Sequence, residues 1–436
     1  MNASRARDPY ASLRLPEFRY WLASASFSTL AGRALAVAIG YQIYELTRDP
    51  LALGILGLVE AIPAVGLSLF GGHFADRHDR RRIVLITRAI SIFAALAFAL
   101  ISLNTHIVGV GALYAVVFIA GMARGFADPA SSAFEAQVVP RELYVNAATW
   151  SGSVWQATAI FGPALGGFVY AFFGVTNTYL MIAALLALAW VCMALIKSKP
   201  MPPYEQGESV WQSIAVGVRY VFHHQILVGS MALDLFAVLF GGAIALLPVF
   251  ASDILNVGPS GLGLLVAAPS VGALLSMLYA TRFPPMKNAG KILLGAVTGF
   301  GVSMIVFAFS RNFYLSLFAL AMSGMFDGIS MVIRETILRL YSPEHLRGRI
   351  AAVSWIFIGS SNEIGAFESG VAASLLGVVP AVWLGGVVTL IVVGVTSVFA
   401  PKLREMNLNV HDAPTEQETA ELEIALVKRT DVNDPL

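Results

Sequence analysis

Charged side chains are scarce in this sequence. Asp, Glu, Lys and Arg make up 13% of the 436 residues, hydrophobic residues make up 57%, and the mean hydropathy is +0.74. Soluble domains usually carry about 25% charged residues. A helix needs about 20 mostly apolar residues to cross a bilayer, and runs of that length recur along this chain. The composition excludes a soluble protein and predicts a polytopic protein of the lipid bilayer.

Several chemical motifs are also missing. Cys192 is the only cysteine, which excludes an internal disulfide and a cysteine-based metal site. The chain has no G-x-x-x-x-G-K-[ST] loop for ATP and no H-E-x-x-H metal motif. His223–His224 is a weak metal signal that a position at the membrane edge explains equally well. We therefore expect no cofactor, no metal and no enzymatic activity, and the net charge of +1 gives no sign of a nucleic-acid partner.

The apolar runs predict an all-α fold, because none alternates with period 2 as the strands of a membrane barrel do. We expect twelve transmembrane helices in two pseudo-symmetric six-helix halves. The runs cover 20–45, 51–75, 83–104, 107–131, 146–172, 176–197, 225–251, 260–281, 291–310, 313–335, 350–375 and 379–400.

These spans divide the chain into five parts: a cytoplasmic segment (1–19), a six-helix half (20–197), a cytoplasmic linker (198–224), a second half (225–400) and a tail (401–436). The first segment is polar and lacks the apolar core of a signal peptide, so we expect insertion to begin with the first span. We also expect an interfacial helix over 209–222 and a short helix near 416–428.

The basic residues predict the orientation. With both termini inside, the outward loops hold only Arg48 and Arg311 of the 28 Lys and Arg. Because cytoplasmic loops carry an excess of Lys and Arg, both termini are expected in the cytoplasm.

The two halves resemble each other. A shift of 203 residues superposes five of the seven glycines between 121 and 174 on glycines of the second half, for example Gly121 on Gly324 and Gly174 on Gly377. The first spans need a shift near 209, which places Gly54 on Gly263. Such repeats are typical of transporters that handle substrate between their halves.

The charge is concentrated in GGHFADRHDRRR (Gly71–Arg82), between the second and third runs. This stretch resembles the loop signature of the major facilitator superfamily. Asp79 stands where that signature commonly has glycine. LTRDPLALGILGLVEAIP, PEHLRGRI and SSNEIGAFESG resemble the subgroup that contains the enterobactin exporters. The resemblance covers residues 18–400 and implies a bacterial cytoplasmic-membrane transporter.

The arginines of this loop are explained by orientation alone, but Asp76 and the glycines are not. The resemblance implies that Asp76 meets the positive N-terminal end of a helix of the other half in the outward-open state. We therefore expect a conformational gate, formed by Gly72, Asp76, Arg77, Arg80 and Arg81. The second half has RFPPMK at this place, so the gate is one-sided.

Several embedded charges are candidates for substrate binding or proton coupling, because such residues are costly in lipid. Arg124 has Asp128 at i+4 for a local pair, and the repeat places it on Asp327 for a pair across the cavity. Arg334 is a competing partner for Asp327. The candidates for a titrating acid are Glu60, Asp234, Asp327, Glu363 and Glu368. A structural role is the better explanation for each acid alone, but we expect at least one of them to titrate.

Two further features of the first half are explained either by a role in transport or by a structural role. Arg33 is suited to anchor an anionic ligand, or to bond helix carbonyls or a nearby acid. GPALGG (Gly162–Gly167) resembles the Gly-Pro motif associated with antiporters, while close helix packing alone explains Gly162, Pro163, Gly166 and Gly167.

We interpret the sequence as a monomeric secondary transporter that exports a small organic molecule, a siderophore or a drug, by exchange for protons. The alternative is import or facilitated diffusion of a metabolite on the same fold. A membrane enzyme or a lipid scramblase is the remote alternative, since catalytic motifs are absent.

Overall fold

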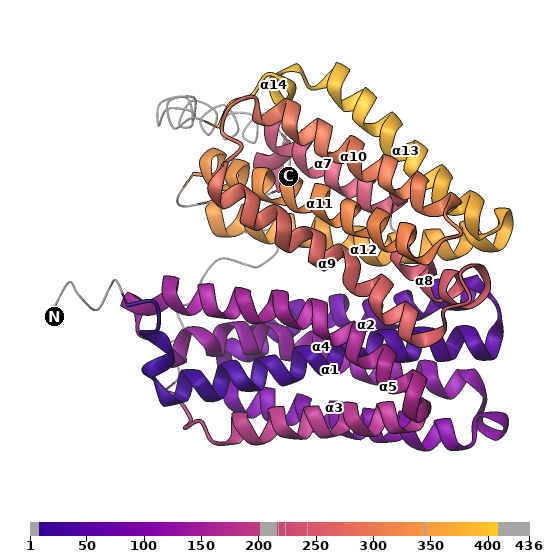
Figure 1. Ribbon diagram of the computed structural model, residues 1–436. Coiled ribbons are helices and arrows are strands. Elements are labelled where there is room, and N and C mark those ends of the chain that lie inside the picture. The colour runs from indigo at the N-terminus through magenta and orange to yellow at the C-terminus, as the bar shows by residue number, and fades with distance from the viewer. Residues whose placement is uncertain are drawn as a thin grey trace, which may run out of the picture.

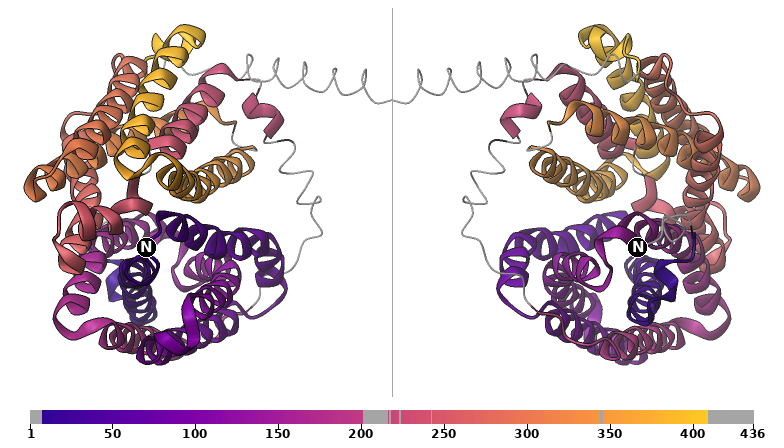
Figure 2. Two further views of the ribbon diagram at one scale, coloured as in Figure 1. Left: turned by 90° about the vertical axis from the view of Figure 1, so that its right-hand side faces the viewer. Right: turned by 90° about the vertical axis from the view of Figure 1, so that its left-hand side faces the viewer.

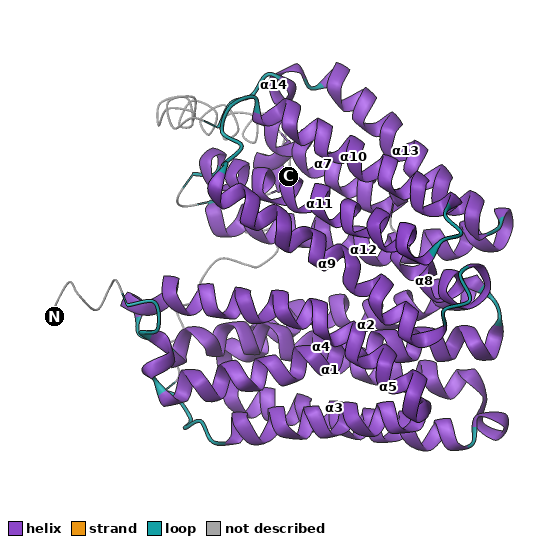
Figure 3. Ribbon diagram, viewed as in Figure 1, coloured by secondary structure: helices purple, strands orange, loops and turns teal. Residues whose placement is uncertain are grey.

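The computed structural model describes residues 8–200, 216, 218–222, 224–241, 243–343 and 346–408. Regular structure in these ranges is helical throughout (Figure 3). The predicted interfacial helix lies largely outside the described residues, and the predicted tail helix lies wholly outside them. The long helices are α1 (Pro16–Thr47), α2 (Pro50–Arg77), α3 (Arg80–Leu103), α4 (Thr105–Val138), α5 (Tyr144–Ala194), α7 (Gln225–Gly241), α9 (Gly258–Arg282), α10 (Ala289–Phe309), α11 (Phe313–Tyr341), α12 (Arg347–Leu376) and α13 (Val378–Phe399).

Short helical pieces join them. These are η2 (Ser12–Arg14), η3 (Arg141–Leu143), η4 (Ala243–Leu246), α8 (Leu247–Val249), the π-helical turn η5 (Phe250–Ile254) and α14 (Pro401–Arg404). The predicted span 225–251 is therefore not one regular helix, because α7 ends at Gly241 and shorter turns continue it.

Ten helices among the described residues are long and apolar enough to cross a bilayer. One of them, Arg141–Ala194, has 54 residues and bends at Gly174, where φ is 81° and ψ is 168°. The predicted spans 146–172 and 176–197 meet at this bend. α12 has 30 residues and is not among the ten. The exact number of twelve spans stays a prediction.

The internal repeat is visible in how the helices pack. A Cβ on Gly121 of α4 would lie 2.6 Å from the carbonyl oxygen of Glu60 in α2, and one on Gly324 of α11 would lie 1.9 Å from that of Pro269 in α9. Gly174 and Gly377 both have positive φ and both stand where one long helix turns into the next. Glycines equivalent in sequence thus perform equivalent tasks in the two halves, as predicted.

The two halves form two bundles that lie side by side, one above the other in Figure 1 and in the end-on views of Figure 2. The first contains α1 to α5 and the second α7 to α14. Across the boundary, α5 packs on α9 and α2 packs on α12. We call the end that holds residues 8–14, the α2–α3 connection and α14 the basic end, and the end that holds Arg48, Gly174 and Gly377 the opposite end. The bundles diverge toward the basic end in Figure 1.

Candidate functional site

The α2–α3 connection is held within its own half. Asp79 caps α3, with Oδ1 accepting hydrogen bonds from the backbone N–H groups of Arg81 at 2.9 Å and Arg82 at 3.4 Å. His78 and Asp79 both have extended backbone with negative φ, so the turn has no need of glycine here. Asp79 replaces the glycine of the signature with a helix cap, a role for which Asp is among the best residues.

The arginines of the connection bind main-chain carbonyls. Arg80 donates to the oxygens of Ala75 at 3.2 Å and Ala133 at 3.3 Å, and Arg81 donates to that of Ala194 at 2.7 Å. Asp76 is 58% exposed and forms an ion pair with Arg80 of its own loop at 3.1 Å. The loop is therefore fixed to α4 and α5, while its acid stays accessible at the basic end.

The glycine pair has divided roles. A Cβ on Gly71 would lie 2.3 Å from the carbonyl oxygen of Gly125, so Gly71 allows α2 and α4 to touch. Gly72, the glycine assigned to the gate, has no atom within 4 Å of such a Cβ. Gly71 was not predicted to take part in helix packing. The spacing of four residues between Gly121 and Gly125 of α4 could have indicated a close approach of another helix.

A group of charges lies in the middle of the first half, facing the second. Arg124 of α4 donates to Glu60 of α2 at 2.7 Å and to Asp128 at 3.3 Å. The predicted i+4 pair is formed. Glu363 of α12 belongs to the other half, and Arg124 and Glu60 are the charged groups that act on it. A Cβ on Gly57 would lie 3.8 Å from Oε2 of Glu363, which locates this acid at the α2–α12 boundary.

The direct pair between Arg124 and Asp327 is not formed. Asp327 instead pairs with Arg334, one oxygen lying 3.7 Å from the guanidinium, and Arg334 also pairs with the buried Asp234 of α7. Arg124 and Arg334 each form ion pairs with acids of their own half. The helices that carry these acids pack together within that half. Arg334, predicted as the competing partner of Asp327, takes this role, whereas the link to Asp234 had no signal in the sequence because the two residues lie 100 positions apart.

Arg33 and Glu368 form no ion pair with another of the described residues. The guanidinium of Arg33 lies 5.4 Å from the ring centre of Trp155, and Arg33 is exposed. Glu368 is half-buried and lies five residues beyond Glu363, about 140° around the helix, so the two acids point in different directions.

The Gly-Pro stretch of α5 packs on two helices. Cβ atoms on Gly162 and Gly166 would lie 2.5 Å from Cβ of Arg33 and 2.7 Å from the carbonyl oxygen of Ala34, both in α1. A Cβ on Gly167 would lie 2.4 Å from the carbonyl oxygen of Pro259 in α9, across the boundary. The carbonyl oxygen of Pro163 faces Gly263 of α9 in the same way. Close packing thus accounts for the three glycines of the motif, Gly162, Gly166 and Gly167.

Polar contacts join the halves at the opposite end. Asp253 accepts hydrogen bonds from Tyr44 at 2.6 Å and from Arg48 at 3.0 Å, and Arg48 also donates to Ser252 at 2.8 Å. Nearer the middle, the buried side chain of Gln156 in α5 donates to the carbonyl oxygen of Ser270 in α9 at 2.6 Å. None of these contacts was predicted from the sequence. Arg48 was assigned to an outward loop, but no partner was predicted for it.

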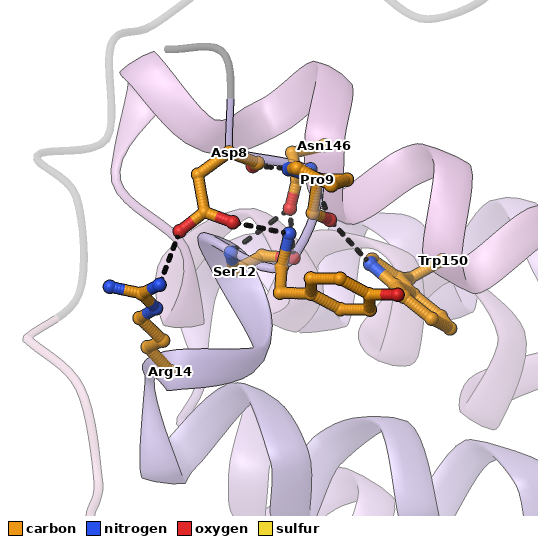
Figure 4. A network of polar contacts seen from close by, with 7 residues as sticks. Asp8, Pro9, Ser12, Arg14, Asn146 and Trp150 are labelled. Atoms are coloured by element: carbon orange, nitrogen blue, oxygen red, sulfur yellow. Dashed lines mark hydrogen bonds and ion pairs between the residues drawn. The ribbon is translucent and has the colours of Figure 1, made fainter. Parts of the chain in front are cut away.

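At the basic end, residues 8–14 are tied to the start of α5 (Figure 4). The main-chain oxygen of Pro9 accepts from Asn146 at 2.8 Å and from Trp150 at 3.0 Å, and Ser12 donates its N–H to Asn146 at 2.9 Å. The segment before α1 therefore moves with α5.

The sequence profile of the major facilitator family described as "Transmembrane secretion effector" matches residues 7–431. The chain belongs to this family. Its relatives in the family are transporters. The "Multidrug efflux pump Tap" of Mycolicibacterium fortuitum is 26% identical over 401 residues, which cover 88% of this chain and 96% of the pump. The "Enterobactin exporter EntS" of Escherichia coli O1:K1 is 24% identical over 340 residues, which cover 77% of this chain and 80% of the exporter.

Solved structures show that the chain has the major facilitator fold. A POT family transporter in complex with 5-aminolevulinic acid superposes with a TM-score of 0.70 and 12% identity, over 88% of this chain and 96% of that one. A bacterial homologue of the lysosomal transporter Spinster, in an inward-facing and unoccupied conformation, gives a TM-score of 0.67 with 13% identity over 92% and 98%. The chain is a multi-pass membrane protein of an efflux-type transporter family.

Proposed function

We propose that this protein exports a small organic molecule across the bacterial cytoplasmic membrane in exchange for protons. The named relatives support the direction of transport, since one is called an efflux pump and another an exporter. The positive-inside rule supports a basic end that faces the cytoplasm. The conformation with halves joined by Asp253 at the opposite end and apart at the basic end is then inward-open.

The observation that carries proton coupling is the position of Glu363. This acid comes from the second half, and the charges that act on it, Arg124 and Glu60, come from the first. When the halves rock, α12 moves relative to α2, so the distance from Glu363 to Arg124 changes. The carboxylate of Glu60 destabilises the charged form of Glu363 and Arg124 stabilises it, so a change in the distances to these two groups changes the proton affinity of Glu363. Proton binding by Glu363 is thereby coupled to the conformational change.

Vesicles whose cytoplasmic face points outward, with an acidic lumen, test this proposal. We expect wild-type protein to accumulate an amphipathic fluorescent substrate against its gradient, and collapse of the pH gradient to stop accumulation. Glu363→Gln should abolish accumulation and keep exchange of substrate across the membrane.

The matched control is Glu368→Gln, because Glu368 lies on the same helix but points in a different direction from Glu363. This variant should accumulate substrate as the wild type does. Accumulation by Glu363→Gln at the wild-type level contradicts the role of Glu363. A wild-type flux that ignores the pH gradient identifies a facilitator and overturns the proposed exchange.

A further inference from the structure

Arg33 is a cation without a matching acid. Of the arginines deep in the bundle, Arg124 pairs with Glu60 and Asp128, and Arg334 pairs with Asp234 and Asp327. Arg88 of α3 is buried and donates to Ser24 and to the carbonyl oxygen of Ala189. Arg33 lies near the middle of α1, and its contact among the described residues is the ring of Trp155.

The charged group that acts on Arg33 is a second cation. Arg124 is close enough to act on it electrostatically, and its side chain is 54% exposed despite its two acid partners. Two like charges repel each other, and the repulsion is relieved when an anion lies between them. Guanidinium groups are suited to this task because they offer a planar fork of N–H donors.

Both arginines lie next to residues of the first half that are close to the second. Arg33 contacts α5, and Arg124 contacts Glu60, which acts on Glu363 of the other half. Side chains that reach α4, α5 and the α2–α12 boundary lie on the inner side of the bundle rather than toward lipid. A Cβ on the neighbouring Gly32 would have no atom within 4 Å, so no other helix covers α1 at that position.

Trp155 supplies an aromatic surface next to these charges. Its side chain is 51% exposed, although it lies in a membrane helix at the boundary. The next residue, Gln156, donates to Ser270 of the second half, which fixes this turn of α5 against α9. An exposed indole beside an unmatched guanidinium can stack on a planar ring while the arginine binds an acidic group of the same ligand.

We propose that Arg33, Arg124 and Trp155 form a subsite for an aromatic anion, such as an aromatic carboxylate. Arg33 is the primary anchor, since Glu60 and Asp128 already compete for Arg124. Trp155 holds the ring. Glu60 and Asp128 offset the charge of Arg124, so the charge of Arg33 is what disfavours an organic cation here. The assignment of this ligand class to the transported substrate rests on the proposed function.

Three naphthalene probes of similar size separate charge from shape. These are 1-naphthoate, which is an anion at neutral pH, 1-naphthylmethanol, which is neutral, and 1-naphthylmethylammonium, which is a cation. Binding to purified full-length protein in nanodiscs is measured by calorimetry at constant pH and low salt. We expect naphthoate to bind at least tenfold more tightly than the alcohol, and the ammonium compound to bind most weakly.

Variants of Arg33 and Trp155 separate the contributions of these two side chains to binding. Arg33→Gln should weaken naphthoate binding at least tenfold and leave the alcohol within about twofold, and Arg33→Lys should recover part of the loss because it keeps the charge. Trp155→Leu should weaken both probes. Arg311→Gln, which removes one positive charge from an exposed loop residue, is the matched control and should bind as the wild type does.

Undiminished naphthoate binding by Arg33→Gln overturns the subsite, and so does an ammonium probe that binds as tightly as naphthoate. A fluorescence-detected gel-filtration profile like that of the wild type shows that Arg33→Gln is folded, and Arg33→Lys gives a second, milder test. Selective naphthoate binding without pH-driven export supports the subsite and contradicts the proposed exchange. Proton-driven export of other compounds without naphthoate binding supports the proposed exchange and contradicts the subsite.

Discussion

His224, directly before α7, shows how burial governs a single residue at the basic end. Its Nδ1 is buried without a hydrogen-bond partner, and the ring of Tyr341 lies 5.2 Å away. Burial, and then the nearby positive charge of Lys402, lower the pKa of His224 below its usual 6.5. The neutral imidazole is therefore the form that this position accepts.

A pH dependence of stability follows from this lowered pKa. The unfolded chain takes up a proton on His224 as the pH falls through about 6.5, while the folded chain resists it, so protonation stabilises the unfolded state. We expect the Tm of the wild type to fall between pH 7.5 and 5.5, and that of His224→Phe to fall less. Thermal unfolding in detergent measures both variants in parallel. An identical pH dependence of the two Tm values contradicts the prediction, because other groups titrate equally in both.

The candidate site was predictable at the residue scale only where partners are close in sequence. The spacing of Arg124 and Asp128 predicted their ion pair, and the spacing of Asp327 and Arg334 predicted theirs. The link from Arg124 to Glu60 depends on how α2 packs on α4, which hydrophobic periodicity does not specify. The exposure of Trp155 likewise depends on the position of the second half.

At the scale of elements, glycines decide where helices approach. Gly167 and Gly263 bring α5 and α9 into backbone contact across the boundary, and Gly370 and Gly54 do the same for α12 and α2. The repeat in the sequence predicted that Gly167 is equivalent to Gly370 and that Gly54 is equivalent to Gly263. It did not predict that some glycines pack within a half, as Gly162 does on α1, and others between halves. This distinction depends on which face of each helix meets the partner.

The ends of the helices were harder to predict than their approximate positions along the chain. The run 107–131 marks the apolar part of α4, but the helix continues to Val138. Hydropathy reports where a helix leaves the apolar layer, whereas the helix itself ends where its backbone hydrogen bonds end, and these are local. Asp49 and Asp79 mark true starts, because each caps a helix with its side chain.

A larger residue at Gly263 tests the contact between α5 and α9. A Cβ there would lie 2.5 Å from the carbonyl oxygen of Pro163, so Gly263→Ala must push the helices apart. Overpacking of this kind costs about 1–3 kcal/mol. We expect a lower Tm and a larger distance between spin labels at the opposite end of the two halves.

The matched control is Gly295→Ala in α10, where the added methyl group would have no atom within 4 Å. This variant should match or slightly exceed the wild-type Tm, because alanine favours helix more than glycine does. A Gly263→Ala protein as stable as Gly295→Ala shows that α5 and α9 do not depend on this contact.

At the scale of the whole molecule, the two ends of the boundary are unequal. The opposite end is joined by Tyr44, Arg48 and Asp253, while Asp76 at the basic end binds only its own loop among the described residues. The glycine contacts set the register of antiparallel α2 on α12, since Gly54 faces Gly370 and a Cβ on Gly57 faces Ala366. The same register, continued toward the basic end, places Asp76 opposite the first residues of α12, which begins at Arg347.

This register indicates what Asp76 does when the halves meet at the basic end. The first turn of a helix has free N–H groups and a partial positive charge, and a carboxylate there is stabilised by about 0.3–1 kcal/mol. Arg282 ends α9 at the corresponding place of the second half, and a cation gains nothing from a helix N-terminus. We therefore expect a one-sided latch that favours closure at the basic end.

Disulfide cross-linking tests the latch. In a Cys192→Ser background, Val145→Cys of α5 and Thr281→Cys of α9 introduce thiols at exposed positions that the α5–α9 register brings together when the basic end closes. Asp76→Asn should slow cross-linking about two- to fivefold, which is the effect of 0.3–1 kcal/mol on the closed population, and should slow transport with it. Glu335→Gln removes another half-exposed acid from the same end and should leave both rates unchanged. If Asp76→Asn cross-links and transports at the wild-type rate, Asp76 is not a latch, and the arginines around it serve orientation alone.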